Sequence, residues 1–434
     1  MNPEATSTSR LRRAGTRWGV VILSFLAVML DGFDTATLAF VLPTLSEQWG
    51  VAPAAFTPAV VLTNLGVVLG YLSCGSLGAW MGRRTMLLLG VTVCGASTLL
   101  TAFVLPTHSI ALLSVLRLLT GIGFGVILPT AVALTVEYFS ARRRELISAT
   151  VTLGLGSGMT LAGFVGGDLI QWVGTTGVFW VAGVPPLILA AIMVWAYPAD
   201  PRAVNAAETA KHEAKVGRLF DPELRLNTTL LWTFSFLIFI AAYTLDNWVP
   251  TLLLGYGFTA AEAPIGLAYV SLGGVIGCVL LIPLAGRIGI ARALILMPTV
   301  GVVCMAVASR IQLTDTLLLL VLAAASAGLT GGQLGQLIMA VSLYPPGTRT
   351  TGIGWASALG RAGSIVGPGV AGLLLALALP GQDIILLATL PVLVAITCAF
   401  VLLRRRAGAT GQGEAEEPAE QAVPARPAGQ AGQG

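Results

Sequence analysis

The chain contains, at residues 18–43, the stretch WGVVILSFLAVMLDGFDTATLAFVLP, in which Asp31 and Asp34 are the only charged residues. An α-helix crosses a bilayer with about 20 mostly apolar residues, because roughly 30 Å of hydrocarbon is spanned at about 1.5 Å per residue. Four arginines precede the stretch, and no small-residue cleavage site follows it. We therefore expect a permanent first membrane span and not a cleavable signal peptide.

Stretches of the same kind recur along the rest of the chain. Of its 434 residues, 56% are hydrophobic and only 10% are charged, whereas about a quarter of the residues in soluble domains are charged. The mean hydropathy is +0.86. The sequence therefore predicts an all-α membrane protein with twelve transmembrane helices. The expected spans are residues 18–43, 58–79, 85–105, 109–136, 146–173, 177–197, 229–254, 264–285, 292–310, 316–344, 350–378 and 383–403.

The positive charges are distributed unevenly over the loops between these spans. Of the 24 Lys and Arg residues, 21 fall on one side of the membrane, only Arg310 falls on the other, and Arg117 and Arg361 lie within helices. Because Lys and Arg collect in cytoplasmic loops, both termini are expected in the cytoplasm. The interpretation is a multi-pass protein of the cell inner (plasma) membrane, surrounded by the lipid bilayer.

One long polar stretch, residues 198–228, divides the spans into two sets of six. The expected organisation is a cytoplasmic N-terminal segment (1–17), a six-helix bundle (18–197), a cytoplasmic central loop (198–228), a second six-helix bundle (229–404) and a cytoplasmic tail (405–434). The tail is rich in Gly, Ala, Pro, Gln and Glu and lacks hydrophobic periodicity. We therefore expect it to be disordered.

The two sets of six spans resemble each other at an offset of 207 residues, with matches at equivalent cytoplasmic turns. The matched residues are Gly82 with Gly289, Arg142 with Arg349, Ala149 with Ala356, and Gly156 with Gly363. The expected architecture is two pseudo-symmetric six-helix bundles that face each other across a central cavity and rock to give alternating access.

The sequence offers no support for enzymatic chemistry. It has no phosphate-binding loop of the form G-x-x-x-x-G-K-[ST], and its only two lysines lie in the central loop. The two histidines, His108 and His212, are far apart, and the five cysteines lie in predicted spans without a C-x-x-C pair. We expect no enzyme activity, no cofactor, no metal site and no nucleic-acid partner.

Charged side chains at bilayer depth cost about 2.5 to 3.5 kcal/mol on insertion scales, so they seldom persist without a partner or a water-filled cavity. Asp31 and Asp34 are three residues apart and share one helix face. Arg117 on the fourth span lies at nearly the same depth, so an ion pair with Asp34 is geometrically possible. Burial favours a protonated carboxyl group and a nearby arginine favours the ionised form. Movement of an arginine would therefore load and unload a proton here, with sodium coupling as the alternative.

Arg361 lies near the middle of the eleventh span, with no acid on its own helix. Its planar guanidinium matches a carboxylate group at two points. We interpret Arg361, together with Arg117, as a binding site for a small organic anion. In the alternative interpretation, the two arginines only hold helices together.

Aromatic and amide side chains on the same set of helices are further candidates for substrate contact. A flat ring stacks on aromatic side chains, and amides hydrogen-bond to hydroxyl groups, although both also occur in ordinary helix packing. The candidates are Phe33, Tyr243, Trp248, Trp355, Gln333, Gln336 and Asn64.

Several motifs resemble those of a known family. Residues 75–84, GSLGAWMGRR, are similar to the major facilitator superfamily signature G-x-x-x-D-R-x-G-R-R between helices 2 and 3. Residues 117–125, RLLTGIGFG, resemble the helix 4 motif of that superfamily. Residues 31–35 (DGFDT), 248–251 (WVPT) and 360–368 (GRAGSIVGP) resemble, more narrowly, the aromatic acid:proton symporters, which import benzoate-like acids such as 4-hydroxybenzoate.

This resemblance implies roles for individual side chains in the helices. Asp31 and Asp34 would serve proton coupling and substrate movement. Arg117 and Glu137 would serve gating or coupling to the proton. Arg361 would face the substrate.

The resemblance also implies a cytoplasmic gate that includes Gly82, Arg83 and Arg84. In this chain Ala79 stands where the signature has Asp, with Trp80 in place of the adjacent basic residue, and Gly286 stands where Asp is common in the second half. The missing acids would weaken the charge cluster that closes the inner gate.

The interpretation that follows is proton-coupled uptake of an aromatic or other small organic carboxylate by a monomeric secondary transporter. Its expected partners are the organic anion and a proton. Two alternatives remain from the residues. The altered gate favours efflux by proton antiport, although Arg361 suits anions, and a membrane sensor would bind solute without moving it.

Overall fold

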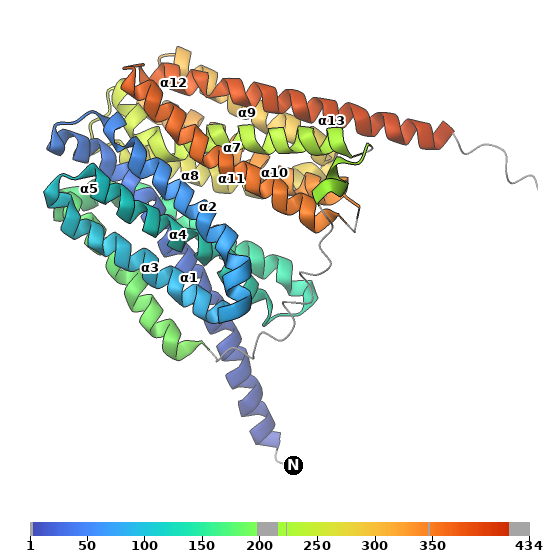
Figure 1. Cartoon of the computed structure of the whole chain (residues 1–434), viewed down its shortest axis with the longest axis horizontal. Coiled ribbons are helices and arrows are strands. Elements are labelled where there is room, and N and C mark those ends of the chain that lie inside the picture. Colours follow the sequence, from blue (N-terminus) through green and yellow to red (C-terminus); the bar gives the residue numbers. More distant parts are fainter. Residues whose placement is uncertain (1–2, 198–215, 223, 346–347, 416–434) are drawn as a thin grey trace, which may run out of the picture.

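The computed structural model describes residues 3–197, 216–222, 224–345 and 348–415, and every regular element in these ranges is a helix (Figure 1). The α-helices are α1 (Pro3–Trp49), α2 (Thr57–Met81), α3 (Arg83–Val104), α4 (Ile110–Val136), α5 (Ala141–Ala196), α7 (Arg225–Leu253), α8 (Pro264–Ile288), α9 (Ile290–Arg310), α10 (Asp315–Leu343), α11 (Arg349–Ala376), α12 (Gly381–Leu387) and α13 (Thr389–Ala415). Short 3-10 turns are η1 (Pro53–Phe56), η2 (Leu105–Thr107), η4 (Val216–Phe220) and η5 (Leu254–Tyr256).

The expected membrane spans are present in the described part of the chain. Eleven helical segments are long and apolar enough to cross a bilayer, and one of them, Leu146–Ala196, has 51 residues. That is more than twice the length of a single span. The segment therefore accounts for both the fifth and the sixth predicted spans, and α12 and α13 together form the last one, Gly381–Arg405.

Helix α5 reverses direction at Gly174, where φ is 70° and ψ is 171°. A glycine adopts this positive φ without the clash that a Cβ atom would cause. Two hydrogen bonds to α1 show the reversal. Thr175 donates to Gln48 near one end of α1, whereas the hydroxyl of Tyr197, just after the end of α5, bonds to Ser24 near the other end.

The helices form two bundles with the same internal packing. Helix α2 packs on α4 and α1 on α5 in the first, as α8 packs on α10 and α7 on α11 in the second. Gly82 and Gly289 occupy equivalent turns with nearly identical backbone angles, φ 84° with ψ 150° and φ 84° with ψ 148°. The predicted match between these two glycines is confirmed.

The residue offset that relates equivalent positions of the two bundles changes by two after the third helix of each bundle. Gly66 on α2 lies against Leu118 on α4, and the equivalent pair is Gly273 on α8 with Ala323 on α10. The offset is therefore 207 residues for the first three helices and 205 for the next two. The connection between the third and fourth helices differs in length between the halves, and sequence matching at one constant offset misses such a change.

Three of the predicted matches are consequently wrong. Arg349 donates from Nε to the carbonyl oxygen five residues before it, and the residue that does the same in the first half is Arg144, not Arg142. Gly363 lies against the backbone of Phe236 as Gly158, not Gly156, lies against that of Met29. The match of Ala149 with Ala356 fails for the same reason, because it uses the offset of 207.

The first and the last helix extend beyond the boundaries that were expected for them. Helix α1 begins at Pro3, so the segment 1–17 is already helical from there. Helix α13 continues to Ala415, which corrects the expectation of disorder for residues 405–415. Most of the expected central loop (198–215) and the rest of the tail (416–434) lie outside the described residues.

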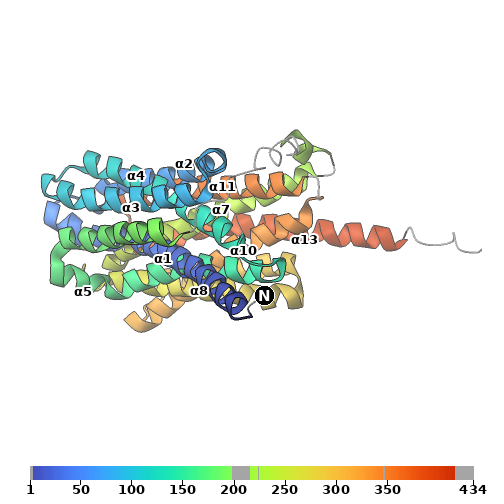
Figure 2. The ribbon, with the colours of Figure 1, turned by 90° about the horizontal axis from the view of Figure 1, so that it is seen from below.

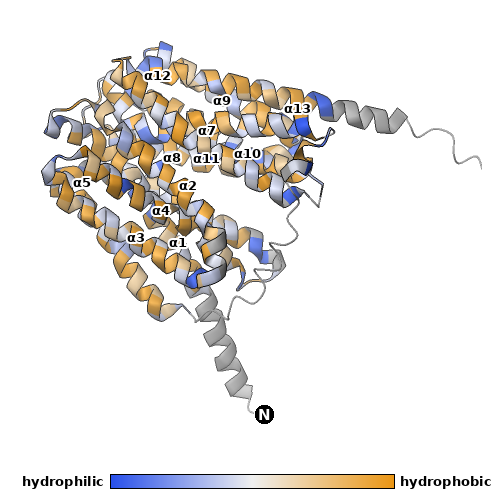
Figure 3. Ribbon diagram, in the orientation of Figure 1, coloured by the Kyte–Doolittle hydropathy of each residue, from blue (hydrophilic) through white to orange (hydrophobic). Residues whose placement is uncertain are grey.

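The outer surface of the bundle is apolar, as a lipid environment requires. Large side chains such as Trp172, Trp195 and Leu72 are exposed there. Figure 3 shows hydrophobic residues along the outward faces of the helices and hydrophilic ones mainly at their ends.

We call the end that carries both chain termini the terminal side, and the end that carries Gly50, Gly174 and Gly257 the far side.

The two bundles meet at the far side and diverge toward the terminal side (Figure 1). On the far side, Gly163 of α5 lies against the backbone of Ala268 of α8, and Gly167 lies against Ala261. Gly372 of α11 lies against Thr57 of α2. Small residues permit this close approach of helices. Figure 2 shows the helices of both bundles running in one general direction, with α13 projecting beyond them.

Candidate functional site

A cavity of about 170 Å³ lies between the two bundles, lined by α1, α2, α4 and α5 of the first and by α7, α10 and α11 of the second. Its walls combine apolar and ionisable side chains. The apolar ones are Leu38, Ala39, Val60, Val67, Phe124, Leu128, Leu155 and Met159. The ionisable and polar ones are Asp31, Asp34, Thr35, Thr63, Asn64, Tyr71, Arg117, Tyr243, Asp246, Asn247, Gln333 and Arg361.

Helical periodicity places these groups on common faces. On α1, Asp31, Asp34 and Leu38 recur at spacings of three and four residues, which lie one above another along a helix. On α7, Tyr243, Asp246 and Asn247 follow the same rule. One face of each helix therefore supplies several of the cavity groups.

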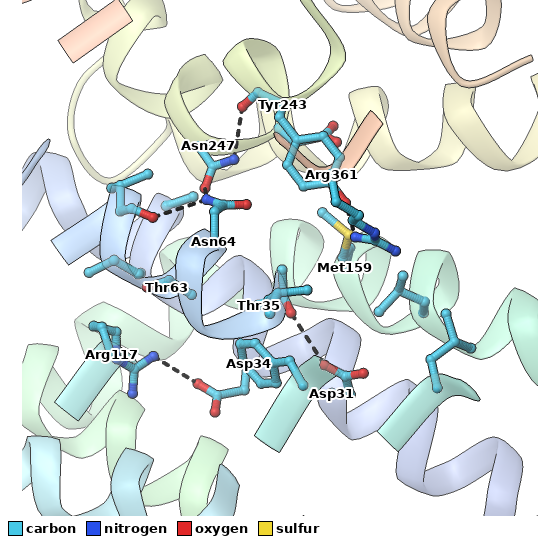
Figure 4. A pocket seen from close by; sticks show the side chains of 18 of the residues that line it. Asp31, Asp34, Thr35, Thr63, Asn64, Arg117, Met159, Tyr243, Asn247 and Arg361 are labelled. Carbon is cyan, nitrogen blue, oxygen red and sulfur yellow. Dashed lines mark hydrogen bonds and ion pairs between the residues drawn. The ribbon is translucent and has the colours of Figure 1, made fainter. Parts of the chain in front are cut away.

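Asp34 is held within the first bundle (Figure 4). Its side chain is 0% exposed and forms an ion pair of 3.3 Å with Arg117, which is 1% exposed. Thr98 donates a hydrogen bond to the same carboxylate, and Arg117 donates to Thr98 at 3.1 Å and to Thr101 at 3.2 Å. The predicted pairing of Asp34 with Arg117 is thus present, with α3 supplying the additional acceptors.

Asp31 has a different environment from Asp34. It is 3% exposed and lines the cavity, and the one hydrogen bond that its carboxyl group receives from the described residues comes from Thr35 at 3.4 Å. Among the described residues it forms no ion pair. The two aspartates, one helical turn apart, are therefore a paired carboxylate and an unpaired one.

Arg361 bridges the two bundles. Its Nη1 donates to the Tyr243 hydroxyl on α7 at 2.7 Å, and its Nη2 donates to the Tyr71 hydroxyl on α2 at 3.0 Å. Its guanidinium also lies over the Tyr71 ring, 4.5 Å from the centroid. Within the described chain no carboxylate pairs with Arg361. A partly buried cation whose partners are neutral hydroxyls can accept an anion without first losing a salt bridge.

A second polar contact between the bundles lies beside this one. Asn64 on α2 donates to Asn247 on α7 at 3.5 Å, and Asn247 donates in turn to the Tyr243 carbonyl at 2.8 Å (Figure 4). Gln333 on α10 also lines the cavity, and its buried Nε2 has no hydrogen-bond partner. The Nε2 atom of Gln333 is therefore an unpaired donor that is covered by protein atoms and not exposed at the cavity wall.

Four of the predicted substrate residues do not line the cavity. Trp248 is 0% exposed and donates from Nε1 to the Pro368 carbonyl at 3.0 Å, so it joins α7 to α11. Phe33 packs in the core against Phe40. Helical spacing alone did not tell which face of each helix points inward, and these rings lie on other faces.

The other two predicted residues are also displaced from the cavity. Trp355 is 43% exposed and stacks on Trp232 at 5.7 Å. Gln336 is 1% exposed, and its Oε1 has no partner. By contrast Tyr243, Gln333, Arg117 and Arg361 line the cavity as expected.

The predicted gating residues lie at the terminal side of the first bundle, away from the cavity. Gly82 forms the turn between α2 and α3, and Arg83 forms an ion pair with Glu137 at the end of α4, both side chains being about half exposed. Arg84 donates to the Val194 carbonyl at 2.6 Å. Gly286 is exposed, with no atom near the position of a Cβ. The side chain of Ala79 lies outside the described residues.

Sequence reasoning did not select five polar groups of the cavity, two of which are the hydroxyl groups of Thr35 and Thr63. Tyr71, Asp246 and Asn247 line it, and Tyr71 and Asn247 bond across the bundles. Asp246 was recognisable as an intramembrane acid, and Asn247 follows it directly. No sequence signal singles out Tyr71, because its importance comes from the other bundle. Within the described residues no group of three His, Cys, Asp or Glu side chains could hold a metal ion.

Comparison with known proteins identifies similar chains. The profile of the Major Facilitator Superfamily matches residues 24–342. A gallate transporter of Pseudomonas putida is 29% identical over 418 residues, covering 90% of this chain and 92% of that protein. A benzoate transport protein of Acinetobacter baylyi is 27% identical over 425 residues, covering 90% of each.

Among solved structures, a bacterial homologue of the human lysosomal transporter Spinster, in an inward-facing and occupied conformation, aligns with a TM-score of 0.71. The alignment covers 89% of this chain and 97% of that one at 15% identity, so it indicates a shared fold.

Proposed function

Since this chain belongs to the major facilitator superfamily, we propose that it imports an aromatic carboxylate together with a proton by alternating access. The relatives that transport gallate and benzoate support this class of substrate. The observation that carries the proposal is Arg361, a cation in the central cavity whose guanidinium, within the described part of the chain, has tyrosine hydroxyls as its hydrogen-bond acceptors.

The cavity suits both ends of an aromatic acid. Arg361 supplies two parallel donors for the carboxylate. Phe124, Leu155 and Met159 form an apolar wall where a ring would lie. Arg117 is already neutralised by Asp34, so we assign it to holding that pair and not to the substrate.

The environments of the two aspartates support a division of roles in proton coupling. Asp34 is fixed by Arg117 and Thr98, whereas Asp31 lines the cavity and forms no ion pair with any described residue. A carboxyl group that is exposed to alternating environments can take up a proton on one side and release it on the other. We assign the transported proton to Asp31 and a positioning role to Asp34.

The arrangement of the bundles supports an orientation. The excess of Lys and Arg lies at the terminal side, so this side faces the cytoplasm by the positive-inside rule. The close contacts of α5 with α8 then seal the outer side, which corresponds to an inward-facing state. Gly82, Arg83, Arg84 and Glu137 lie at the cytoplasmic side, where the two bundles must approach for the cavity to open outward.

Transport assays in liposomes test this function. Purified protein is reconstituted, and uptake of radiolabelled benzoate and gallate is compared with that of succinate and acetate. We expect accumulation of the aromatic acids when the interior is alkaline, and collapse of that accumulation when an ionophore dissipates the proton gradient. Accumulation driven by a sodium gradient alone would contradict proton coupling, and absence of benzoate and gallate counterflow would contradict the substrate class.

A further inference from the structure

Asp246 is the ionisable cavity group that the proposed transport cycle does not use. It lies on α7, one turn beyond Tyr243, and lines the cavity. Among the described residues it forms neither a hydrogen bond nor an ion pair. Because an intramembrane carboxyl group is costly, an unpaired one that faces a cavity indicates a polar ligand group at that place.

Two amides accompany this carboxyl group. Asn247 is the next residue of α7, and Asn64 meets it from α2 at 3.5 Å. Asn64 uses its Nδ2 for this contact and for the Val60 carbonyl at 3.0 Å. Its Oδ1 therefore remains an acceptor without a hydrogen-bond partner in the described residues. The carboxyl oxygens of Asp246 and the Oδ1 of Asn64 make this part of the cavity rich in acceptors.

The position of these acceptors relative to Arg361 is set by the helices. Asp246 and Asn247 lie about 4.5 to 6 Å beyond Tyr243 along α7, toward the far side, at 1.5 Å per residue. Side chains in a helix lean toward its N-terminus, so the Tyr243 hydroxyl reaches Arg361 in the direction away from Asp246. Figure 4 shows Asn64 and Asn247 together, separated from the guanidinium of Arg361. The cation and the acceptors therefore occupy different ends of one cavity.

We propose that Asp246, Asn64 and Asn247 form a hydroxyl-binding subsite, so that the preferred substrate is an aromatic carboxylate with at least one ring hydroxyl group. This inference rests on the proposed function and specifies its substrate. A phenolic hydroxyl donates to the acceptors of the subsite while the carboxylate binds Arg361. An unsubstituted ring leaves those acceptors desolvated and unpaired, which is how a polar site rejects an analogue that lacks the hydroxyl.

Competition in liposomes tests the subsite. Inhibition of radiolabelled benzoate counterflow is measured with unlabelled benzoate, 4-hydroxybenzoate and gallate. We expect the better of the two hydroxylated acids to bind at least roughly tenfold more tightly than benzoate, since a hydrogen bond to a charged acceptor is in this range. In the Asp246→Leu protein we expect that preference to fall about tenfold or more, because the hydroxylated acids lose a hydrogen bond and benzoate no longer leaves the carboxyl group unpaired.

Two further variants separate recognition from folding. Asn64→Leu removes the second acceptor and should lower the preference in the same direction. Asp383→Leu removes a carboxylate of the same bundle that is 40% exposed and paired with Arg310 outside the cavity, so the preference should not change. The midpoint of thermal unfolding in detergent, compared with that of the unaltered protein, shows in each case whether the variant is folded.

Five results would overturn the subsite. An equal loss of benzoate and hydroxylated acids in Asp246→Leu would show a structural role, and an unchanged preference would show no role. A changed number of protons per substrate in that variant would make Asp246 a proton carrier instead. If the unaltered protein carries benzoate yet shows no preference, the subsite alone fails. If it carries neither benzoate nor the hydroxylated acids, the proposed function fails and the subsite with it.

Discussion

Arg361 of α11 and Tyr71 of α2 are joined by a hydrogen bond of 3.0 Å, with the guanidinium stacked over the tyrosine ring. The bond connects the two bundles at the cavity that would receive the substrate. A carboxylate that binds Arg361 competes with the tyrosine hydroxyl for the same donor. Substrate binding would thus alter a contact that holds the bundles together.

Replacement of the two tyrosines should have different effects, one on substrate affinity and the other on the balance between inward-open and outward-open states. Tyr71→Phe and Tyr243→Phe each remove one hydroxyl from Arg361, but only Tyr71 belongs to the opposite bundle. We expect Tyr71→Phe to shift the balance between inward-open and outward-open states, measured by distances between spin labels on the two bundles. Tyr243→Phe should change substrate affinity and leave that balance unaltered. Equal distance distributions in the two variants would contradict the idea that the Arg361–Tyr71 hydrogen bond holds the two bundles together.

Arg361→Lys should weaken carboxylate binding by roughly 10- to 100-fold. Lysine keeps the charge but not the planar pair of donors, and hydrogen bonds to charged groups contribute about 1.5 to 3 kcal/mol. Binding is measured by calorimetry with benzoate and hydroxybenzoates. Arg310→Lys is the matched control, because Arg310 is exposed and pairs with Asp383 outside the cavity. Unaltered affinity for every acid in Arg361→Lys would remove the basis of the anion site.

Asp31→Asn should abolish accumulation driven by a proton gradient and preserve exchange of substrate for substrate. The amide cannot carry a proton, yet it can still accept the hydrogen bond from Thr35. Uptake with an alkaline interior and counterflow without a gradient are measured on the same preparation. Gradient-driven accumulation at the level of the unaltered protein would exclude Asp31 as the proton carrier.

Asp34→Ala should destabilise the protein more than Asp31→Ala does. Its loss leaves Arg117 buried without its carboxylate, and breaking a buried ion pair costs about 3 to 5 kcal/mol. Among the described residues Asp31 forms no ion pair, so its loss leaves no arginine without a bonded carboxylate. Thermal unfolding in detergent is the measurement, with a lower midpoint expected for Asp34→Ala. Equal midpoints would show that the Asp34–Arg117 pair does not hold α1 to α4.

Gly163→Val should prevent closure of the far side. A Cβ atom at Gly163 would collide with the backbone of Ala268, so α5 and α8 could no longer meet. We expect transport to stop and cysteines introduced on the far-side walls of the cavity to label faster. Gly354→Val on α11 is the control, because no atom lies near the position of its Cβ. Slow labelling in Gly163→Val would mean that this contact does not seal the cavity.

The motifs of the chain were sufficient to predict which family it resembles and that it is a membrane transport protein. The match to the Major Facilitator Superfamily and the gallate and benzoate relatives confirm the resemblance. The charged residues of the cavity were also predictable, because an ion at bilayer depth needs a partner or a polar cavity wherever it occurs. Asp31, Asp34, Arg117 and Arg361 all line the cavity.

The uncharged cavity residues were predicted less well. Trp248 contacts helix α11, and Trp355 stacks on the ring of Trp232, so neither lines the cavity. Tyr71 and Asn247 line it instead. An aromatic ring is compatible with lipid, core or cavity, so its identity does not show which it faces. The constant offset of 207 residues between the two halves also failed. The change of this offset to 205 is visible only from the tertiary contacts, which show the backbone that each glycine lies against.

The sequence by itself determined that this protein spans the membrane many times, because bilayer thickness dictates the length and apolarity of each helix. It also determined which few charges lie at membrane depth. Only the tertiary structure decided that Asp34 is paired and Asp31 is not, and that Arg361 meets tyrosines from both bundles. Those distinctions depend on the rotation and packing of helices far apart in the chain, and helix periodicity carries no information about them.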